Sequence, residues 1–185
     1  MFMSLKEHYI KNIIPAMKEK FEYKNTLAVP KIKKVVINIG INPAMKDKMN
    51  IIENTLIRIT GQKPVKTLAK KSISNFKIRQ GMVIGMMVTL RKKRMYDFLD
   101  KLINIVLPRL RDFHGLSEKS IDKEGNLNIG FREHIVFPEI NPDEIESLHG
   151  LEVSIVISAK NKKEGLEFLK LLGFLFKKHT KTTNN

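Results

Sequence analysis

The chain has 185 residues, of which 42% are apolar, and its 34 lysines and arginines outnumber 19 aspartates and glutamates, giving a formal net charge of +15. The absence of cysteine excludes a disulfide framework and any zinc site built on thiolates. The N-terminus becomes charged too soon for a signal peptide, and no apolar run approaches the ~20 residues of a membrane helix, so we expect a soluble intracellular protein.

The first predicted element is an amphipathic helix that ends near Phe21. Ser4 and Glu7 form a capping-box pair at its start, and Pro15 is expected to bend or split it. An apolar residue recurs at every fourth position, which is the spacing of one helix face: Leu5, Tyr9, Ile13, Met17 and Phe21.

A strand is expected after Pro30, where the apolar period changes to two, and Gly40 ends it. Its inward side holds Val35, Ile37 and Ile39, and its outward side holds Lys34, Val36 and Asn38. Asn42 and Pro43 then predict an N-cap and a first helical position, and this second helix should stop at Gly61. The apolar stripe of this helix is Met45, Met49, Ile52, Leu56 and Ile59.

Residues 64–69 are expected to form a short strand and residues 70–81 a long exposed loop, because neither period persists in the loop. Residues 82–91 then form the most regular strand of the chain. Its outward face should leave room at Gly85 for an approaching partner. The inward positions are Met82, Ile84, Met86, Val88 and Leu90, and the outward ones Val83, Gly85, Met87, Thr89 and Arg91.

The second half of the chain alternates helices and strands. In order, we expect a helix over 92–107 terminated by Pro108, a turn-rich segment over 108–125, a strand over 126–131, a short helix over 141–150, a strand over 151–157 and a last helix capped by Asn161 and Glu164. Together the elements predict an α+β fold: a single domain whose largely antiparallel sheet of about five strands has helices packed on one face. We place this domain at residues 1–176 and expect 177–185 to be a flexible basic tail.

No acidic residue occurs between Glu53 and Asp97. The eleven cations of this basic block would repel one another on folding, so we expect an anionic polymer to supply the missing charge. The block spans a turn, a loop and a strand, which favours a folded nucleic-acid binder over a disordered arm. Its members are Arg58, Lys63, Lys66, Lys70, Lys71, Lys77, Arg79, Arg91, Lys92, Lys93 and Arg94.

If each strand turns its apolar side to the helices, the opposite side becomes a polar face suited to RNA. Lysine and arginine would meet phosphates there, whereas asparagine, threonine and serine would bond sugars, phosphates or base edges. A merely solvated face is the alternative, and the adjoining basic block argues against it. The predicted face holds Lys34, Asn38, Lys66, Thr89, Arg91, Asn128 and Ser154.

The sequence carries no catalytic motif, its five histidines lack metal-ligand spacing, and we expect no metal or cofactor. Two rival functions remain. A nucleic-acid enzyme or its accessory would reveal itself by metal-dependent turnover, and a peripheral membrane protein by co-sedimentation with anionic vesicles. The charge lies mainly on loop and strand rather than on an amphipathic helix, which disfavours the membrane.

Several phrases resemble the bacterial-type family of large-subunit ribosomal proteins that bind 5S ribosomal RNA, the fifth of the large-subunit series. They run in family order from about Leu5 to Phe176. The phrases are Lys33-Val-Val-Ile-Asn-Ile-Gly40, Thr60-Gly-Gln-Lys-Pro64, residues 69–82, Val88-Thr-Leu-Arg91, Arg94-Met-Tyr-Asp-Phe-Leu99, residues 107–113 and Phe137-Pro-Glu-Ile140.

The resemblance implies a structural, non-enzymatic protein of the ribosome, in the cytoplasm of a bacterium or in an organelle matrix. It implies 5S RNA binding by the matching positions Asn38, Gln62 and Thr89. The basic block and the predicted polar face add four cations to the expected rRNA-binding residues: Lys34, Lys63, Lys66 and Arg91. The resemblance also implies a loop that contacts transfer RNA through Lys70, Lys71, Ser72, Ser74, Asn75, Phe76, Lys77 and Arg79. The implied partners are 5S ribosomal RNA, large-subunit ribosomal RNA, peptidyl-site transfer RNA, neighbouring 5S-associated ribosomal proteins and a small-subunit head protein, without a membrane.

Overall fold

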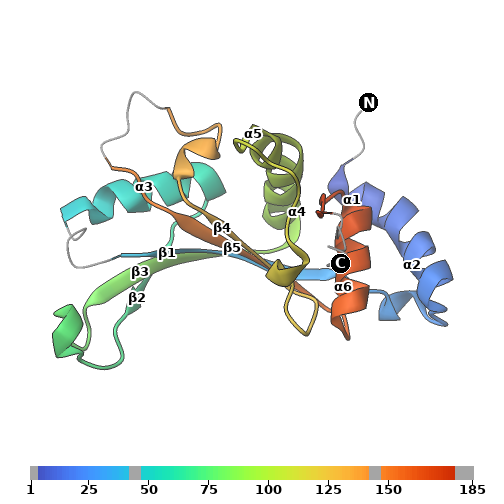
Figure 1. Ribbon diagram of the computed structural model, residues 1–185, viewed down its shortest axis with the longest axis horizontal. Helices are drawn as coiled ribbons and strands as arrows, with labels where there is room; N and C mark the ends of the chain where they lie inside the picture. The colour runs from blue at the N-terminus through green and yellow to red at the C-terminus, as the bar shows by residue number, and fades with distance from the viewer. Residues whose placement is uncertain (1–3, 42–46, 142–146, 178–185) are drawn as a thin grey trace, which may run out of the picture.

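The structure, a computed structural model, describes residues 4–41, 47–141 and 147–177. Its centre is a five-stranded sheet in the order β2-β3-β1-β5-β4, in which every neighbouring pair of strands is antiparallel (Figure 1). The strands are β1 (Ile32–Gly40), β2 (Val65–Leu68), β3 (Val83–Leu90), β4 (Leu127–Phe131) and β5 (Leu151–Ile157). The predicted α+β fold and its antiparallel sheet are confirmed.

The period-two pattern of the sequence gives the sheet one buried face. Strand side chains alternate between the two faces, so the apolar positions of neighbouring strands meet on one side. The buried residues on that side are Val35, Ile37, Ile39, Met86, Val88, Leu90, Leu127, Ile129, Phe131, Leu151, Val153, Ile155 and Ile157. The inward positions Met82 and Ile84 are the exception, because β3 there leads into the 70–81 loop, and Ile84 remains 36% exposed.

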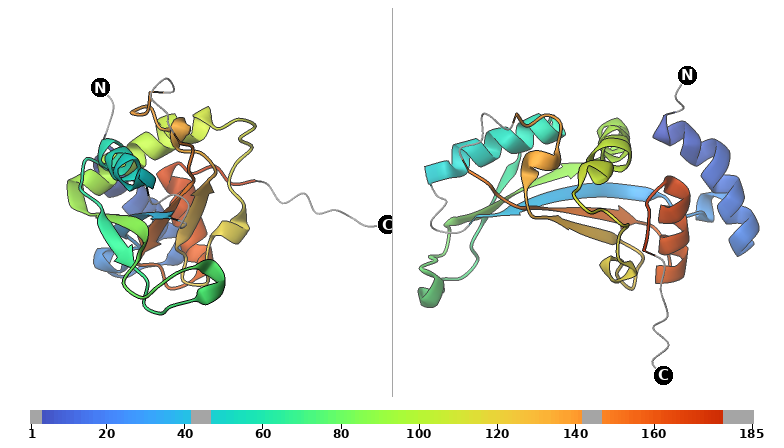
Figure 2. Two further views of the ribbon diagram at one scale, coloured as in Figure 1. Left: turned by 90° about the vertical axis from the view of Figure 1, so that its left-hand side faces the viewer. Right: turned by 45° about the horizontal axis from the view of Figure 1, so that its top comes forward.

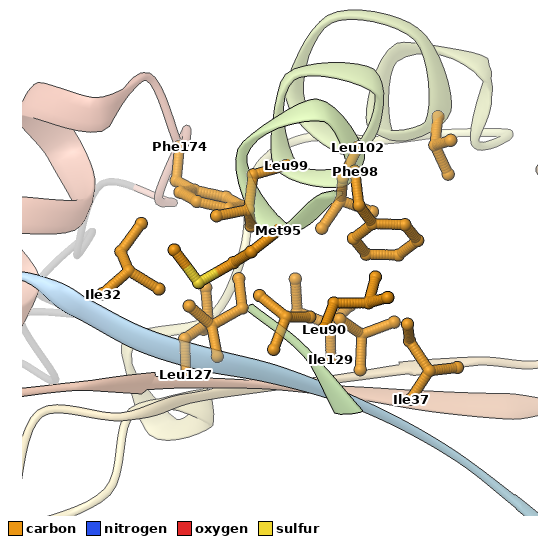
Figure 3. Packing of buried hydrophobic residues seen from close by; sticks show 14 of the residues in the cluster. Ile32, Ile37, Leu90, Met95, Phe98, Leu99, Leu102, Leu127, Ile129 and Phe174 are labelled. Atoms are coloured by element: carbon orange, nitrogen blue, oxygen red, sulfur yellow. The ribbon is translucent and has the colours of Figure 1, made fainter. Parts of the chain in front are cut away.

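Helices α3 (Met49–Thr60) and α4 (Lys92–Lys101) cover the buried face (Figure 1). Figure 3 shows the contact: Met95, Phe98 and Leu99 of α4 point onto the strands beneath. Burying each such side chain contributes about 1.5–3 kcal/mol. Gly61 ends α3 with φ +65°, as the sequence predicts, because glycine adopts this left-handed conformation without steric cost.

The N-terminal helix runs to Phe21, as predicted, and consists of α1 (Leu5–His8), a π-helical segment Tyr9–Ile13 and α2 (Ile14–Phe21). The expected disturbance at Pro15 appears as that π-helical segment, since proline has no N–H for the helical ladder. This helix packs against α6 (Lys162–Leu172) at one end of the sheet (Figure 2), where Lys20 and Glu167 form an ion pair of 2.6 Å.

The predicted cap of α6 is confirmed. Asn161 Oδ1 accepts a hydrogen bond from the backbone N–H of Glu164 (2.9 Å), and Glu164 Oε2 accepts one from the backbone N–H of Lys160 (2.8 Å). The reciprocal bonds satisfy donors that would otherwise lack partners at the helix start.

Two predicted boundaries are wrong. Pro108 does not terminate the α4 helix, because a π-helical segment Leu102–Val106 precedes it and α5 (Leu107–Arg109) passes through it. Residues 147–150 are not helical, so the short helix predicted over 141–150 does not reach Gly150. Residues 142–146 of that predicted helix, the predicted Asn42-Pro43 cap and the tail beyond Lys177 lie outside the described residues.

Candidate nucleic-acid interface

The face of the sheet opposite α3 and α4 carries no helix among the described residues (Figure 1). Strand pairing places Asn128, Ser154, Val36 and Thr89 in one row across β4, β5, β1 and β3. The next row along the same face is Gly130, Glu152, Asn38, Met87 and Val65. We call the side defined by these two rows the open face.

Asn38 and Thr89 are therefore diagonal neighbours on the open face, since Asn38 pairs with Met87 and Thr89 with Val36. Both side chains are half-buried. Lys34 lies on the same face at one end of β1. Arg91 follows β3 at that end, and its Nη1 donates to the carbonyl of Lys33 (3.4 Å). The predicted grouping of Lys34, Asn38, Thr89 and Arg91 is confirmed.

The turn after α3 brings Gln62 to the same strand. Gln62 Nε2 donates to the backbone carbonyl of Thr89 (3.4 Å), although the two residues are far apart in sequence. Thr60 Oγ1 fixes the turn by accepting from the backbone N–H of Gln62 (3.2 Å) and donating to the carbonyl of Leu56 (2.6 Å). The turn therefore holds a polar side chain beside Thr89.

The 70–81 loop is exposed, as predicted, and projects beyond β2 and β3 on the side away from the helices (Figures 1 and 2). Hydrogen bonds connect the two sides of the loop. Ile73 and Ile78 exchange backbone bonds of 2.8 and 3.1 Å, and Ser72 Oγ accepts from the N–H of Gln80 (3.0 Å). Phe76 stands in a short 3-10 turn and is 66% exposed. Lys70, Lys71, Ser72, Ser74, Asn75, Phe76, Lys77 and Arg79 are all exposed.

Lys66 is not on the open face, so that part of the prediction is wrong. It pairs with Met86, whose side chain is buried beneath the helices, and its Nζ lies 3.4 Å from Glu53 Oε2 of α3. Glu53 also lies 3.8 Å from Lys63 Nζ in the turn. Two members of the basic block therefore have a carboxylate nearby, which the acid-free run of sequence did not reveal.

The expected room at Gly85 is also missing. A Cβ at this position would lie 2.8 Å from the carbonyl oxygen of Ile39 and 2.8 Å from Thr67 Oγ1. Neighbouring strands thus occupy the space that the glycine leaves, and its small size serves strand packing rather than access for a partner.

Sequence analysis missed Glu152, an exposed carboxylate on the open face in the same row as Asn38. It also missed the apolar part of that face, where Val65 and Leu68 of the edge strand are 65% and 55% exposed. The alternation over 151–157 could have revealed Glu152, since it falls on the outward side with Ser154. The open face is consequently less positive than the loop beside it.

Two histidines stack in the interior. The rings of His134 and His149 have centroids 3.9 Å apart and planes inclined by 13°, and both residues are buried. Burial lowers the pKa of both, and the neighbouring His134 helps to lower the pKa of His149 to about 4. In the described ranges no three histidine or acidic side chains are grouped to hold a metal, and no helix is long and apolar enough to cross a membrane.

Fold and site together define a class: a single-domain α+β protein that offers an open polar sheet face and a basic loop to a large anionic partner. Comparison with known proteins names the family. Residues 25–79 match the family model for ribosomal protein L5, and residues 83–176 match that for the ribosomal L5P family C-terminus. The chain belongs to this L5 family of ribosomal proteins.

Relatives named "Large ribosomal subunit protein uL5" span nearly the whole chain. The protein of Halothermothrix orenii is 52% identical over 174 residues, covering 93% of this chain and 97% of its own. That of Desulforapulum autotrophicum is 54% identical over 177 residues, covering 94% and 98%, and that of Thermotoga maritima 51% over 180, covering 96% and 97%. Membership makes the chain a structural component of the bacterial ribosome rather than an enzyme, as predicted, with ribosomal RNA and ribosomal components as its partners.

Proposed function

We propose that the open face binds 5S ribosomal RNA and thereby helps to attach this RNA in the central protuberance of the large subunit. The observation that carries the proposal is that Asn38 and Thr89 share a helix-free face, while Gln62 reaches the backbone carbonyl of Thr89 from the turn after α3. Amide and hydroxyl groups can read sugar hydroxyls and base edges, which is how proteins recognise the shape of RNA.

Affinity and register come from different groups in this proposal. Lys34 and Arg91 at one end of the open face, and the cations of the 70–81 loop, would contact phosphates and release counterions. Asn38, Gln62 and Thr89 would fix the position of the RNA on the sheet. Because Lys66 and Lys63 lie close to Glu53, we give them a smaller share in RNA binding than the sequence suggested.

The 70–81 loop is proposed to contact transfer RNA in the peptidyl site. It is exposed, is held in shape by its own hydrogen bonds, and projects from the end of the sheet formed by β2 and β3 (Figure 1). A loop that is ordered before binding loses less conformational entropy when it meets its partner. Large-subunit ribosomal RNA, neighbouring 5S-associated proteins and a small-subunit head protein, to which the chain would bridge, complete the proposed partners.

A binding titration with labelled 5S ribosomal RNA tests the proposal. Thr89→Val keeps the shape of the strand residue and removes its hydroxyl, so it should weaken binding about 5-fold to 150-fold, corresponding to about 1–3 kcal/mol for an unpaired buried polar partner. Gln62→Leu should act in the same direction. The matched control is a pair of lysines on opposite faces: Lys34→Ala should weaken binding more than Lys66→Ala.

Salt dependence separates the two kinds of contact. Loss of one phosphate contact should reduce the slope of log K against log salt by about 0.7–0.9, so Lys34→Ala should flatten it and Thr89→Val should not. If Thr89→Val and Gln62→Leu both leave the affinity for 5S RNA intact, the assignment of register to these residues is wrong.

A further inference from the structure

A groove of about 600 Å³ lies between α1 and the start of α4. Its volume falls within the range of roughly 300–1,000 Å³ that is typical of small-ligand sites. α4 covers the helix side of the sheet (Figure 1), so the groove is separate from the open face. The lining residues that matter here are Lys6, Lys92, Lys93, Tyr96, Asp97 and Asp100.

The three lysines of this groove outnumber its two carboxylates, Asp97 and Asp100. Lys92 and Lys93 stand in the first turn of α4, which contains no acidic residue, and positive charge is unfavourable at that end of a helix. Within the described ranges, neither these two nor Lys6 of α1 lies within 4.0 Å of a carboxylate oxygen. An anion bound beside these lysines would offset the cost of their position at the start of α4.

The other groups in the groove suit a nucleobase. Tyr96 is half-buried and lines the groove, and burial raises the pKa of its phenol, so the side chain is a neutral aromatic group. Asp100 Oδ1 accepts from Asn104 (3.0 Å), whereas the exposed carboxylate of Asp97 accepts no hydrogen bond from the residues that the structure describes. A free carboxylate beside an aromatic ring can accept from adjacent ring N–H and amino donors, a pattern that guanine presents on its Watson–Crick edge.

We propose that this groove binds one unpaired guanine nucleotide. The phosphate lies among Lys6, Lys92 and Lys93, the base stacks on Tyr96, and its donor edge faces Asp97. The inference rests on the proposed RNA-binding function for the source of the nucleotide, although the recognition chemistry is the same for a free guanine nucleotide. The protein would then hold RNA at two separate places, the open face and this groove.

Fluorescence anisotropy with labelled pentanucleotides UUGUU and UUAUU tests the proposal on the full chain. We expect UUGUU to bind at least about fivefold more tightly, which is the lower end for a well-placed pair of hydrogen bonds. Asp97→Asn should abolish this preference without weakening UUAUU binding, because it also removes a negative charge that repels phosphate. Lys6→Ala with Lys93→Ala should weaken both and reduce the salt slope by about 0.7 per lysine. Lys163→Ala, an exposed lysine in the first turn of α6, is the matched control and should change neither.

Competition with guanosine monophosphate shows whether the groove binds a free guanine nucleotide or needs a guanine within RNA. Equal displacement by the mononucleotide identifies a free nucleotide as sufficient, and weak displacement identifies RNA; either supports the site. Equal binding of the two pentanucleotides, or a preference that survives Asp97→Asn, overturns it. So does a double lysine variant that shifts the unfolding temperature but not the binding. Thr89→Val should leave the guanine preference intact, so failure at this groove and failure at the open face are separable.

Discussion

The stacked histidines give a pH dependence of stability that can be worked out from the structure. The pKa of His149 falls from 6.5 to about 4 because the residue is buried, with a further contribution from the adjacent His134. As pH falls below about 6.5, the unfolded chain binds a proton at this position before the folded chain does. The contribution to stability is therefore fully present above about pH 6.5 and is lost as pH falls toward 4.

Each unit of pKa difference corresponds to about 1.36 kcal/mol, so moving from about pH 7.5 to pH 5 should cost about 2 kcal/mol at this residue. Urea unfolding of the wild type and of His149→Asn at both pH values measures the difference, because the asparagine does not titrate. We expect the variant to lose about 2 kcal/mol less than the wild type over this range. His114→Asn removes an exposed histidine and is the control.

Equal acid-induced losses in His149→Asn and the wild type, within about 0.5 kcal/mol, would refute this reasoning. The common carboxylates titrate in both proteins and cancel in the comparison. His134 should respond in the same direction, since burial lowers its pKa as well.

Further predictions concern packing and capping. Gly85→Ala should destabilise the fold by about 1–3 kcal/mol, since its Cβ would lie 2.8 Å from both the Ile39 carbonyl oxygen and Thr67 Oγ1. The midpoint of urea unfolding measures this loss of stability. An unchanged midpoint would contradict the close approach of the strands at Gly85. Asn161→Ala should cost about 1 kcal/mol by removing the bond to the N–H of Glu164, which thermal unfolding detects, while Asn161→Asp should retain most of the stability.

The sequence predicts those features that arise from local periodicity. The alternation over 32–40, 83–90, 127–131 and 151–157 identified four strands because each has one side that is apolar over most of its length. Gly61 and Asn161 marked helix ends because left-handed backbone and side-chain capping depend on single residues. These signals need no knowledge of distant parts of the chain.

Features that depend on distant contacts were not predictable. The face of Lys66 could not be read from β2, because that strand has only four residues and its pairing with β3 contains an irregularity between Thr67 and Leu68. Glu53 was visible at the start of the acid-free run, but its ion pair with Lys66 depends on how α3 packs on β2. The same limit applies to the candidate site: Asn38 and Thr89 could be placed on one face, but the bond from Gln62 to the Thr89 carbonyl follows from the tertiary fold.

The distribution of charge agrees with the proposed division between groups that give affinity for RNA and groups that fix its register. The open face carries Lys34 near one end and a carboxylate, Glu152, beside Asn38, so it cannot bind RNA by charge alone. The 70–81 loop, by contrast, contains lysines and an arginine and no acidic residue. An antiparallel sheet can have one solvated polar face while its other face packs on the core. The polar side chains of the open face therefore stand on a backbone that the sheet hydrogen bonds hold rigid. In the proposed function, phosphates are attracted at the loop and the strand ends, away from the polar groups proposed to set the register.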